Sequence, residues 1–271
     1  MLHGCANGLF YYPDREDYGT PAGHGLAYED CHFASRDGTR LHGWFMPARG
    51  PARGTVIHFH GNAQNISAHQ DFVTWLPAAG FNVFTFDYRG YGRSQGRPSR
   101  RGVYEDSVAA IEYVRARKDV DPERLLVLGQ SLGGANAIAA LGSGHGAGVR
   151  GIVIDSTFRS YRRIARDVAG KTILLWPVQW PLAWFLVTGD YSPEDYVTKL
   201  PIAPIVFMHG TSDQVVPYPH SPALFALARE PKELWTIRGG RHIDGLIGYQ
   251  GVYQSKVAEF YRRALEASGA R

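Results

Sequence analysis

The chain has 271 residues, 44% of them hydrophobic, and its 29 lysine and arginine residues outnumber its 25 acidic residues to give a formal charge of +4. This length and apolar content suit one large α/β domain over residues 1–271 and leave too little chain for a second full domain. The basic residues are scattered, and the short dense runs at 97–101 and 161–166 are not the long stripe of a nucleic-acid-binding protein, so we expect no nucleic-acid partner.

The first residues bear on localisation. Residues 2–5 (LHGC) resemble the end of a bacterial lipoprotein signal, but only Met1 precedes them, and a working signal needs a basic segment and an apolar stretch. Either the match is accidental and Cys5 is a free thiol in a cytoplasmic protein, or Cys5 carries lipid in a cell-envelope lipoprotein whose signal lies upstream. The two cysteines, Cys5 and Cys31, are too few for a disulfide framework.

The residues that follow predict an antiparallel hairpin. After a loop-like leader at 8–25, apolar and polar residues alternate over Leu26–Ser35 and Thr39–Pro47. Alternation with period two is typical of half-buried strands, and the intervening Asp37-Gly38 is a favoured hairpin turn.

From residue 54 onward, short apolar strands alternate with helical segments. Each predicted strand is apolar on both faces, as in a parallel sheet covered by helices. The strands are Thr55–Phe59, Asn82–Phe86, Arg124–Leu128, Gly151–Ile154, Pro204–Met208 and Glu233–Ile237. The helices between and after them are Ile66–Ala79, Val103–Lys118, Leu132–Gly142, Ser221–Ala228 and Tyr249–Ala267. The pattern predicts an α/β fold with a doubly wound, mostly parallel sheet and the hairpin at one edge.

One connection is far longer than the others. Residues 157–200 separate two predicted strands, so we interpret them as a helical cap inserted into the domain. Within the cap, residues 172–187 (TILLWPVQWPLAWFLV) contain three tryptophans and two prolines, and are too short and too interrupted for a bilayer span. Three interpretations stay open: a lid that lines an acyl pocket, a patch that contacts a membrane, or a helical pair packed on the core.

A glycine-rich turn follows the third of these strands. Residues 129–134 read GQSLGG, and glycines two positions before and after Ser131 leave room for the sharp strand-to-helix turn of a nucleophile elbow. Such a turn holds the serine hydroxyl exposed at the end of the strand. The N–H of Leu132 then lies at a helix N-terminus, where it can stabilise an oxyanion.

A serine needs a base to remove its proton and an acid to orient that base. Asp213 follows the fifth predicted strand and His242 follows the sixth, so both should meet Ser131 at the carboxyl edge of the sheet. We therefore predict Ser131, Asp213 and His242 as a catalytic triad. Asp155, at the end of the fourth strand, is a competing acid, and Asp244 is interpreted as a local loop acid.

The loop after the first of these strands should supply a second oxyanion donor. Gly61 lets the backbone approach the reacting carbonyl, which favours the N–H of Asn62 as the donor, with Ala63 as the alternative. His58 and His60 are spaced like metal ligands, but no third ligand is apparent, so we expect a hydrogen-bonded structural role for His60. We expect no metal and no cofactor.

Several ordered motifs extend the pattern over most of the chain. They are HFHGNAQN at 58–65, FNVFTFDYRGYGRSQGRPS at 81–99, LGQSLGG at 128–134, IDSTFRS at 154–160, HGTSDQVVP at 209–217, PKEL at 231–234 and GGRH at 239–242. From about Leu26 to the last helix, the chain resembles the α/β-hydrolase superfamily and, within it, the Bem46-like serine hydrolases. The resemblance implies a cofactor-independent hydrolase of carboxylic esters, thioesters or amides, often with a short cap. This chain departs from the family where relatives often carry Asn, at Ile243, and in its tryptophan-rich cap, which leaves substrate size open.

These observations predict a serine hydrolase that cleaves acyl esters through an acyl-enzyme. Short to medium acyl esters are the expected small-molecule substrates, because the cap is apolar and no charge clamp is evident near the triad. An acyl-protein thioesterase or a peptidase could use the same residues, whereas a haloalkane dehalogenase would need a carboxylate at position 131. A non-catalytic ligand-binding or membrane-associated protein on the same fold is the alternative of a different class.

Overall fold

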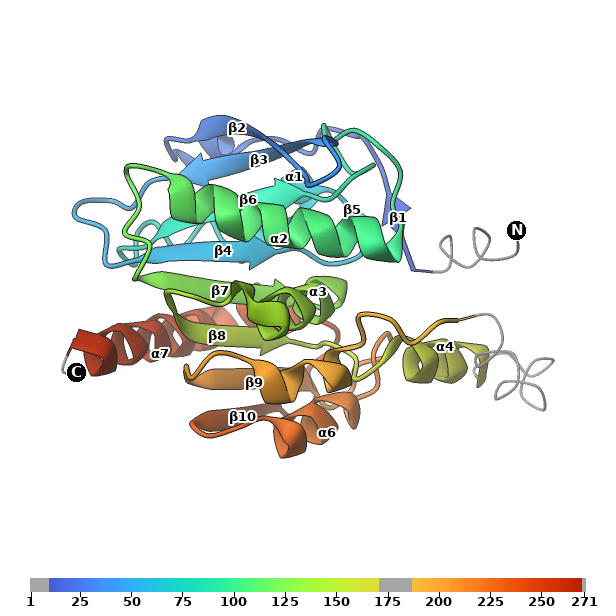
Figure 1. Cartoon of the computed structure of the whole chain (residues 1–271). Helices are drawn as coiled ribbons and strands as arrows, with labels where there is room; N and C mark the ends of the chain where they lie inside the picture. The colour runs from blue at the N-terminus through green and yellow to red at the C-terminus, as the bar shows by residue number, and fades with distance from the viewer. Residues whose placement is uncertain (1–9, 171–186, 270–271) are drawn as a thin grey trace.

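The computed structural model describes residues 10–170 and 187–269 and is organised around one central sheet (Figure 1). Within these residues, eight strands pair in the order β10-β9-β8-β7-β4-β6-β3-β2. They are β2 (Glu29–Ala34), β3 (Arg40–Met46), β4 (Thr55–Phe59), β6 (Asn82–Asp87), β7 (Leu125–Gln130), β8 (Val149–Asp155), β9 (Ile205–Gly210) and β10 (Lys232–Ile237). The strands from β10 to β6 are parallel, and β3 pairs antiparallel with β6 and β2. The predicted mostly parallel sheet with an N-terminal hairpin is confirmed.

The hairpin turn forms where Asp37-Gly38 predicted it. Ala34 pairs with Arg40, and the N–H of Ser35 donates to the carbonyl of Thr39 at 2.8 Å. Gly38 has a φ of +82°, a left-handed conformation that glycine adopts without a steric cost. The hairpin therefore places β2 at one edge of the sheet.

Side chains of the central strands alternate between two separate cores. In β7, Leu125 and Val127 enter one core, while Leu126 and Leu128 enter the other. The same alternation occurs in β9. Because successive side chains of a strand point to opposite faces, an all-apolar strand must be covered on both sides.

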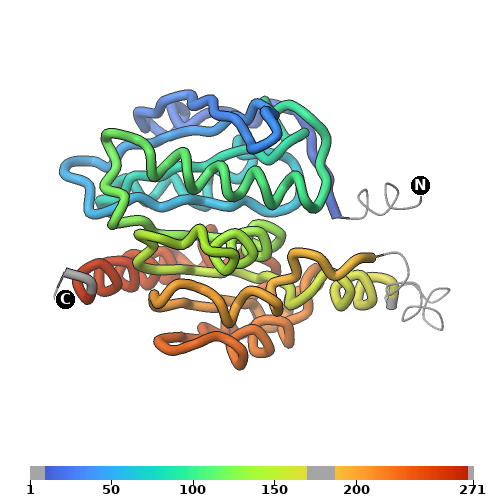
Figure 2. Tube along the Cα trace, in the orientation of Figure 1, coloured from blue at the N-terminus to red at the C-terminus, as the bar shows by residue number. Residues whose placement is uncertain are grey.

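Helices cover both faces of the sheet, as a doubly wound fold requires. The helices are α2 (Arg100–Ala116), α3 (Leu132–Ala140), α6 (His220–Leu227) and α7 (Val252–Gly269). The first three contribute Ile111, Ile138 and Leu224 to one core, and α7 contributes Phe260 to the other. Figures 1 and 2 show α2 and α3 in front of the sheet and α7 passing behind it. Short helical turns also occur between the longer elements: η2 (Pro21–His24), η4 (Leu141–His145), η8 (Asp244–Leu246) and η9 (Tyr249–Gly251).

The predicted helix at Ile66–Ala79 is wrong in length. Only α1 (Ile66–His69) is α-helical, a 3-10 turn η3 (Gln70–Phe72) follows, and residues 73–80 form turns. The N–H of Leu76 donates to the carbonyl of Val73, which closes a tighter ring than an α-helix does. Pro77 disfavours an α-helical conformation at the residue before it. The buried Val73 and Leu76 side chains explain the helix-like apolar spacing.

The predicted leader contains a short strand. β1 (Tyr12–Pro13) pairs in parallel with β5 (Ala63–Gln64) to form a two-stranded sheet outside the central one. The leader thus lies beside the loop that follows β4, and Figure 1 shows β1 next to β5 at the edge to which the arrows of β4 and β7 point.

The long connection between β8 and β9 is described in part. It contains α4 (Tyr161–Gly170), η6 (Pro193–Asp195) and η7 (Val197–Lys199), and α4 lies beyond the carboxyl edge of the sheet (Figure 1). Of the segment that we predict as a lid, a membrane patch or plain core, residues 172–186 lie outside the described residues, as does Cys5. Among the described helices, none is both long enough and apolar enough to span a bilayer.

Candidate active site

Ser131 occupies a strained turn between β7 and α3. Its φ of 51° and ψ of −119° are rare for a residue with a side chain. Two hydrogen bonds hold this conformation: the N–H of Ser131 donates to the carbonyl of Asp155 at 2.8 Å, and the Thr157 hydroxyl donates to the carbonyl of Ser131 at 2.7 Å. The sharp turn expected of a nucleophile elbow is therefore present.

The glycine two residues after Ser131 allows α3 to approach β4. A Cβ atom at Gly133 would lie 2.0 Å from the carbonyl oxygen of Phe59 and 2.4 Å from that of His60. Real Cβ contacts do not reach such distances, so this position requires glycine. The close approach brings the start of α3 next to the loop after β4.

The structure brings Ser131, His242 and Asp213 together at the carboxyl edge of the sheet. His242 Nε2 lies 3.0 Å from Ser131 Oγ, and His242 Nδ1 lies 2.7 Å from Asp213 Oδ2. Asp213 belongs to the loop after β9 and His242 to the loop after β10. Residues that are 111 positions apart in sequence meet because parallel strands end at a common edge.

The environment of Asp213 keeps its carboxylate ionised. Burial by itself would raise the pKa of Asp213, but hydrogen bonds from His209 and His242 outweigh it and hold the pKa well below its usual range. Oδ1 also accepts from the N–H groups of Val215 and Val216, at 2.8 and 2.9 Å. A carboxylate only accepts, so His242 donates from Nδ1, and its Nε2 is left to accept the proton of the Ser131 hydroxyl.

His209 is a member of this cluster that the sequence did not reveal. Its Nε2 lies 3.1 Å from Asp213 Oδ2 and 2.9 Å from the carbonyl oxygen of Val216, while its Nδ1 lies 2.6 Å from the Ser221 hydroxyl. Both neighbours of Nε2 are acceptors, so Nε2 carries the proton and Nδ1 accepts from Ser221. Its position four residues before Asp213, at the end of a strand, was the available sequence signal.

The competing acid Asp155 lies in a different, fully buried network. Its carboxylate accepts from the Ser156 hydroxyl at 2.8 Å and from the amide of Gln130 at 3.3 Å. Burial raises the pKa of Asp155 to about 6, although these two hydrogen bonds favour its ionised form. His58 extends the network, with its ring nitrogens 2.9 Å from Gln130 Oε1 and 3.0 Å from the Thr85 hydroxyl.

Asp244, expected to be a local loop acid, accepts from the backbone N–H of Arg241 at 2.9 Å. This contact is local, between residues three positions apart in the loop that carries His242.

The two predicted oxyanion donors flank the nucleophile. A Cβ atom at Gly61 would lie 3.8 Å from Ser131 Cβ, so the loop that carries Asn62 passes close to the serine. In the part of the chain that the structure describes, the N–H groups of Asn62 and Leu132 donate to no backbone carbonyl. A ligand oxygen would therefore compete with no backbone carbonyl of these residues for either N–H.

His60 differs from its expected hydrogen-bonded role. It is fully buried, and among the described residues neither of its ring nitrogens finds a hydrogen-bond partner. Burial lowers the pKa of His60, so the ring is neutral, and it packs against Tyr88 and Tyr91 at centroid distances of 4.6 and 5.3 Å. Within residues 10–170 and 187–269, no group of three or more His, Cys, Asp or Glu side chains is placed to hold a metal ion.

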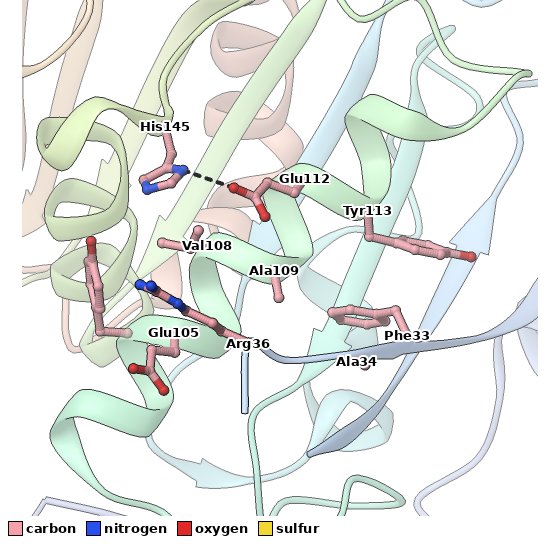
Figure 3. A pocket seen from close by; sticks show the side chains of 10 residues that line it. Phe33, Ala34, Arg36, Glu105, Val108, Ala109, Glu112, Tyr113 and His145 are labelled. Atoms are coloured by element: carbon pink, nitrogen blue, oxygen red, sulfur yellow. Dashed lines mark ion pairs between the residues drawn. The ribbon is translucent and has the colours of Figure 1, made fainter. Parts of the chain in front are cut away.

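A separate cavity of about 550 Å³ lies along α2 (Figure 3). Phe33, Val108 and Tyr113 contribute apolar surface, and Glu112 forms an ion pair with His145 at 3.1 Å. None of the predicted site residues lines it, so it belongs to a different part of the molecule from Ser131.

The chain matches known proteins over most of its length. A family model described as serine aminopeptidase, S33, matches residues 50–200. Protein YfhR of Escherichia coli K12 is 43% identical over 270 residues, which cover 98% of this chain and 90% of that protein. Protein bem46 of Schizosaccharomyces pombe is 30% identical over 222 residues, which cover 81% of this chain and 72% of that protein.

Solved structures of esterases share the fold. An esterase of Pyrococcus furiosus superposes with a TM-score of 0.76 at 21% identity, covering 94% of this chain and 97% of that chain. Acetyl xylan esterase 1 from Thermoanaerobacterium gives a TM-score of 0.69 at 18% identity, covering 97% and 99%. At these identities the likeness establishes the fold.

Proposed function

Because the chain belongs to the α/β-hydrolase superfamily and to its Bem46-like family, we propose that it is a serine hydrolase that cleaves carboxylic esters through an acyl-enzyme on Ser131. The observation that carries this proposal is the continuous hydrogen-bonded line from Asp213 through His242 to the hydroxyl of Ser131, with distances of 2.7 and 3.0 Å. A geometry of this kind activates a serine without a metal or an organic cofactor.

The reaction follows from the proton positions. His242 Nε2 takes the hydroxyl proton while Ser131 Oγ bonds to the ester carbonyl carbon, whose oxygen becomes an oxyanion. The N–H groups of Leu132 and Asn62 stabilise that charge, and Asp213 stabilises the imidazolium. His242 then gives its proton to the departing alcohol, and the acyl group stays on Ser131. Water, deprotonated by His242, attacks the acyl carbon. The bond from that carbon to Ser131 Oγ then breaks, His242 returns its proton to Oγ, and the acid is released.

We expect short to medium acyl esters as substrates. We also propose that residues 157–200 form a cap inserted into a single domain over 1–271. The described start of the cap is hydrogen-bonded to the rest of the molecule, because His220 Nε2 of α6 lies 2.9 Å from Asp167 Oδ2 of α4. An acyl thioester would be attacked in the same way. A peptide substrate is the second candidate, because the matching family model carries the description of a serine aminopeptidase.

A chain-length series of p-nitrophenyl esters tests the proposal, with Ser131→Ala as the matched variant. We expect turnover by the native chain, a fall in kcat of about 10³ or more in the variant, and fluorophosphonate labelling of the native chain only. Equal turnover by both proteins would rule out Ser131 as the nucleophile. A folded native chain that neither hydrolyses esters nor reacts with the probe would favour a non-catalytic ligand-binding protein.

A further inference from the structure

The side chain of Asn62 is fixed by two donors that lie far from it in sequence. Its Oδ1 atom accepts from the hydroxyl of Tyr91 at 3.0 Å and from the backbone N–H of Tyr12 at 3.1 Å. We propose that Tyr91 is a positioning residue which, together with β1, holds the backbone N–H of Asn62 in the direction that stabilises the oxyanion. This inference rests on the proposed serine hydrolase function.

Hydrogen-bond chemistry settles the direction of both contacts. A backbone N–H can only donate, so the amide atom of Asn62 that faces Tyr12 is its oxygen. The hydroxyl of Tyr91 meets the same oxygen and must therefore donate as well. Two donors on one acceptor restrict rotation of the Asn62 side chain, and hence movement of the backbone to which it is attached.

Tyr91 is suited to this role because its own position is rigid. The side chain is fully buried, and its ring packs against Tyr88 at 5.8 Å and against His60 at 5.3 Å. Burial raises the pKa of Tyr91 well above its usual value, so the hydroxyl keeps its proton. Tyr88 supports the same loop by donating to the carbonyl of His60 at 3.2 Å.

The second donor, the N–H of Tyr12, belongs to a segment that hydrogen bonds hold against the loop after β4. Tyr12 pairs with Ala63 in the register of β1 and β5, directly after Asn62 (Figure 1). Asp14 continues the attachment, since its carboxylate accepts from the amide of Asn65 at 2.7 Å and its carbonyl accepts from the N–H of Gly92 at 2.8 Å. Residues 12–14 of the leader are therefore hydrogen-bonded to the loop that lies beside Ser131.

The expected benefit is electrostatic. An N–H aimed at the oxyanion before the reaction begins costs no reorganisation in the transition state, and loss of one such donor lowers kcat by about 10²–10³. Loss of a support leaves the donor in place but less well aimed. We therefore expect Tyr91→Phe to lower kcat by about 10-fold and to leave KM within about twofold, since the ground-state carbonyl gains less from this N–H.

The experiment measures kcat and KM with p-nitrophenyl butyrate in the full chain. Tyr261→Phe is the matched control, because it removes a buried tyrosine hydroxyl that donates to the carbonyl of Val127 at 2.8 Å, on the face covered by α7. We expect this control to retain the native kcat. A trifluoromethyl ketone, which forms an oxyanion with the serine, should bind Tyr91→Phe about 10-fold more weakly while the control binds normally.

Asn62→Ala keeps the backbone N–H but removes the acceptor, and it serves equally well if Tyr91→Phe does not fold. Each variant should lower kcat, and the double variant should be no slower than Asn62→Ala, because Asn62→Ala already removes the acceptor that Tyr91 and Tyr12 share. A native kcat in Tyr91→Phe or in Asn62→Ala, or additive losses in the double variant, overturns the positioning role. Turnover by Ser131→Ala would instead overturn the proposed function itself.

Discussion

His209 donates from Nε2 to Oδ2 of Asp213 at 3.1 Å, and this is the same oxygen that accepts from His242 at 2.7 Å. Two imidazoles therefore share one carboxylate oxygen, and only one of them reaches Ser131. His209 is fully buried and its other nitrogen accepts from Ser221, so its ring cannot turn without losing a hydrogen bond.

We expect His209→Phe to weaken both the fold and the reaction. The substitution leaves the carbonyl of Val216 and the hydroxyl of Ser221 without their partner, which should lower the free energy of unfolding by about 1–3 kcal/mol. Asp213 would also lose a donor that lowers its pKa, so it would orient His242 less firmly, and kcat should fall by about 10-fold. Urea unfolding and ester kinetics measure the two effects. His145→Phe is the control, because His145 lies half-buried in η4 and faces Glu112 of α2 rather than Ser131. A native kcat in His209→Phe would contradict the interpretation.

Asp155 should make stability depend on pH in a recognisable direction. Its pKa is about 6 in the folded chain against an ordinary value of 3.8, so its ionised form is destabilised by folding. The destabilising effect of the ionised carboxylate is absent below pH 3.8 and complete above pH 6. There it lowers the free energy of unfolding by about 3 kcal/mol. The free energy of unfolding of Asp155→Asn, relative to the native chain, should therefore rise as pH rises from 4 to about 7.

Asp167→Asn provides a control of opposite sign for that experiment. Burial by itself would raise the pKa of Asp167, but hydrogen bonds from His220 and Arg166 lower it. Its carboxylate therefore adds stability above its unfolded pKa, and this stability is lost as pH falls through the folded value. Relative to the native chain, Asp167→Asn should become less stable as pH rises to about 4, and the difference should then stay level up to pH 7, where that of Asp155→Asn changes. A pH-independent difference for Asp155→Asn would show that Asp155 ionises normally.

The backbone strain at Ser131 predicts that a substitution at this position can raise stability while it removes activity. Glycine adopts a φ of 51° without the penalty that a side chain brings, and such strain costs on the order of 1–3 kcal/mol. Ser131→Gly should therefore be more stable than Ser131→Ala by about 1–2 kcal/mol, while neither hydrolyses esters. Differential scanning calorimetry makes the comparison. Equal stability of the two variants would mean that the turn is not strained.

Gly133→Ala should damage the site by separating α3 from β4. The added Cβ would lie 2.0 Å from a backbone carbonyl oxygen, which cannot move without displacing the strand. We expect a loss of roughly 3 kcal/mol or more in the free energy of unfolding. Gly23→Ala is the matched control, because nothing lies within 4 Å of its added Cβ. Similar stability of the two variants would contradict the close approach.

The sequence by itself determined the strands, the elbow and the order of the three predicted triad residues. Alternating and all-apolar runs are local patterns, and they predicted the position of each central strand to within a few residues. Parallel strands end at one edge whatever their order, so Asp213 and His242 could be assigned to that edge before their neighbours were known.

Only the tertiary structure decided which groups support the site. Tyr91 and Tyr12 meet at Asn62 because a turn after β6 and the leader of the chain converge on one loop, and no local pattern encodes that convergence. The buried positions of Asp155 and His60 likewise depend on layers contributed by distant segments. The apolar residues at 73–80 have the spacing of a helix, but the segment forms turns. Pro77 and the burial of the segment's apolar side chains outweigh the periodic pattern. Local pattern fixes where a strand ends, whereas packing between strands fixes what each side chain touches.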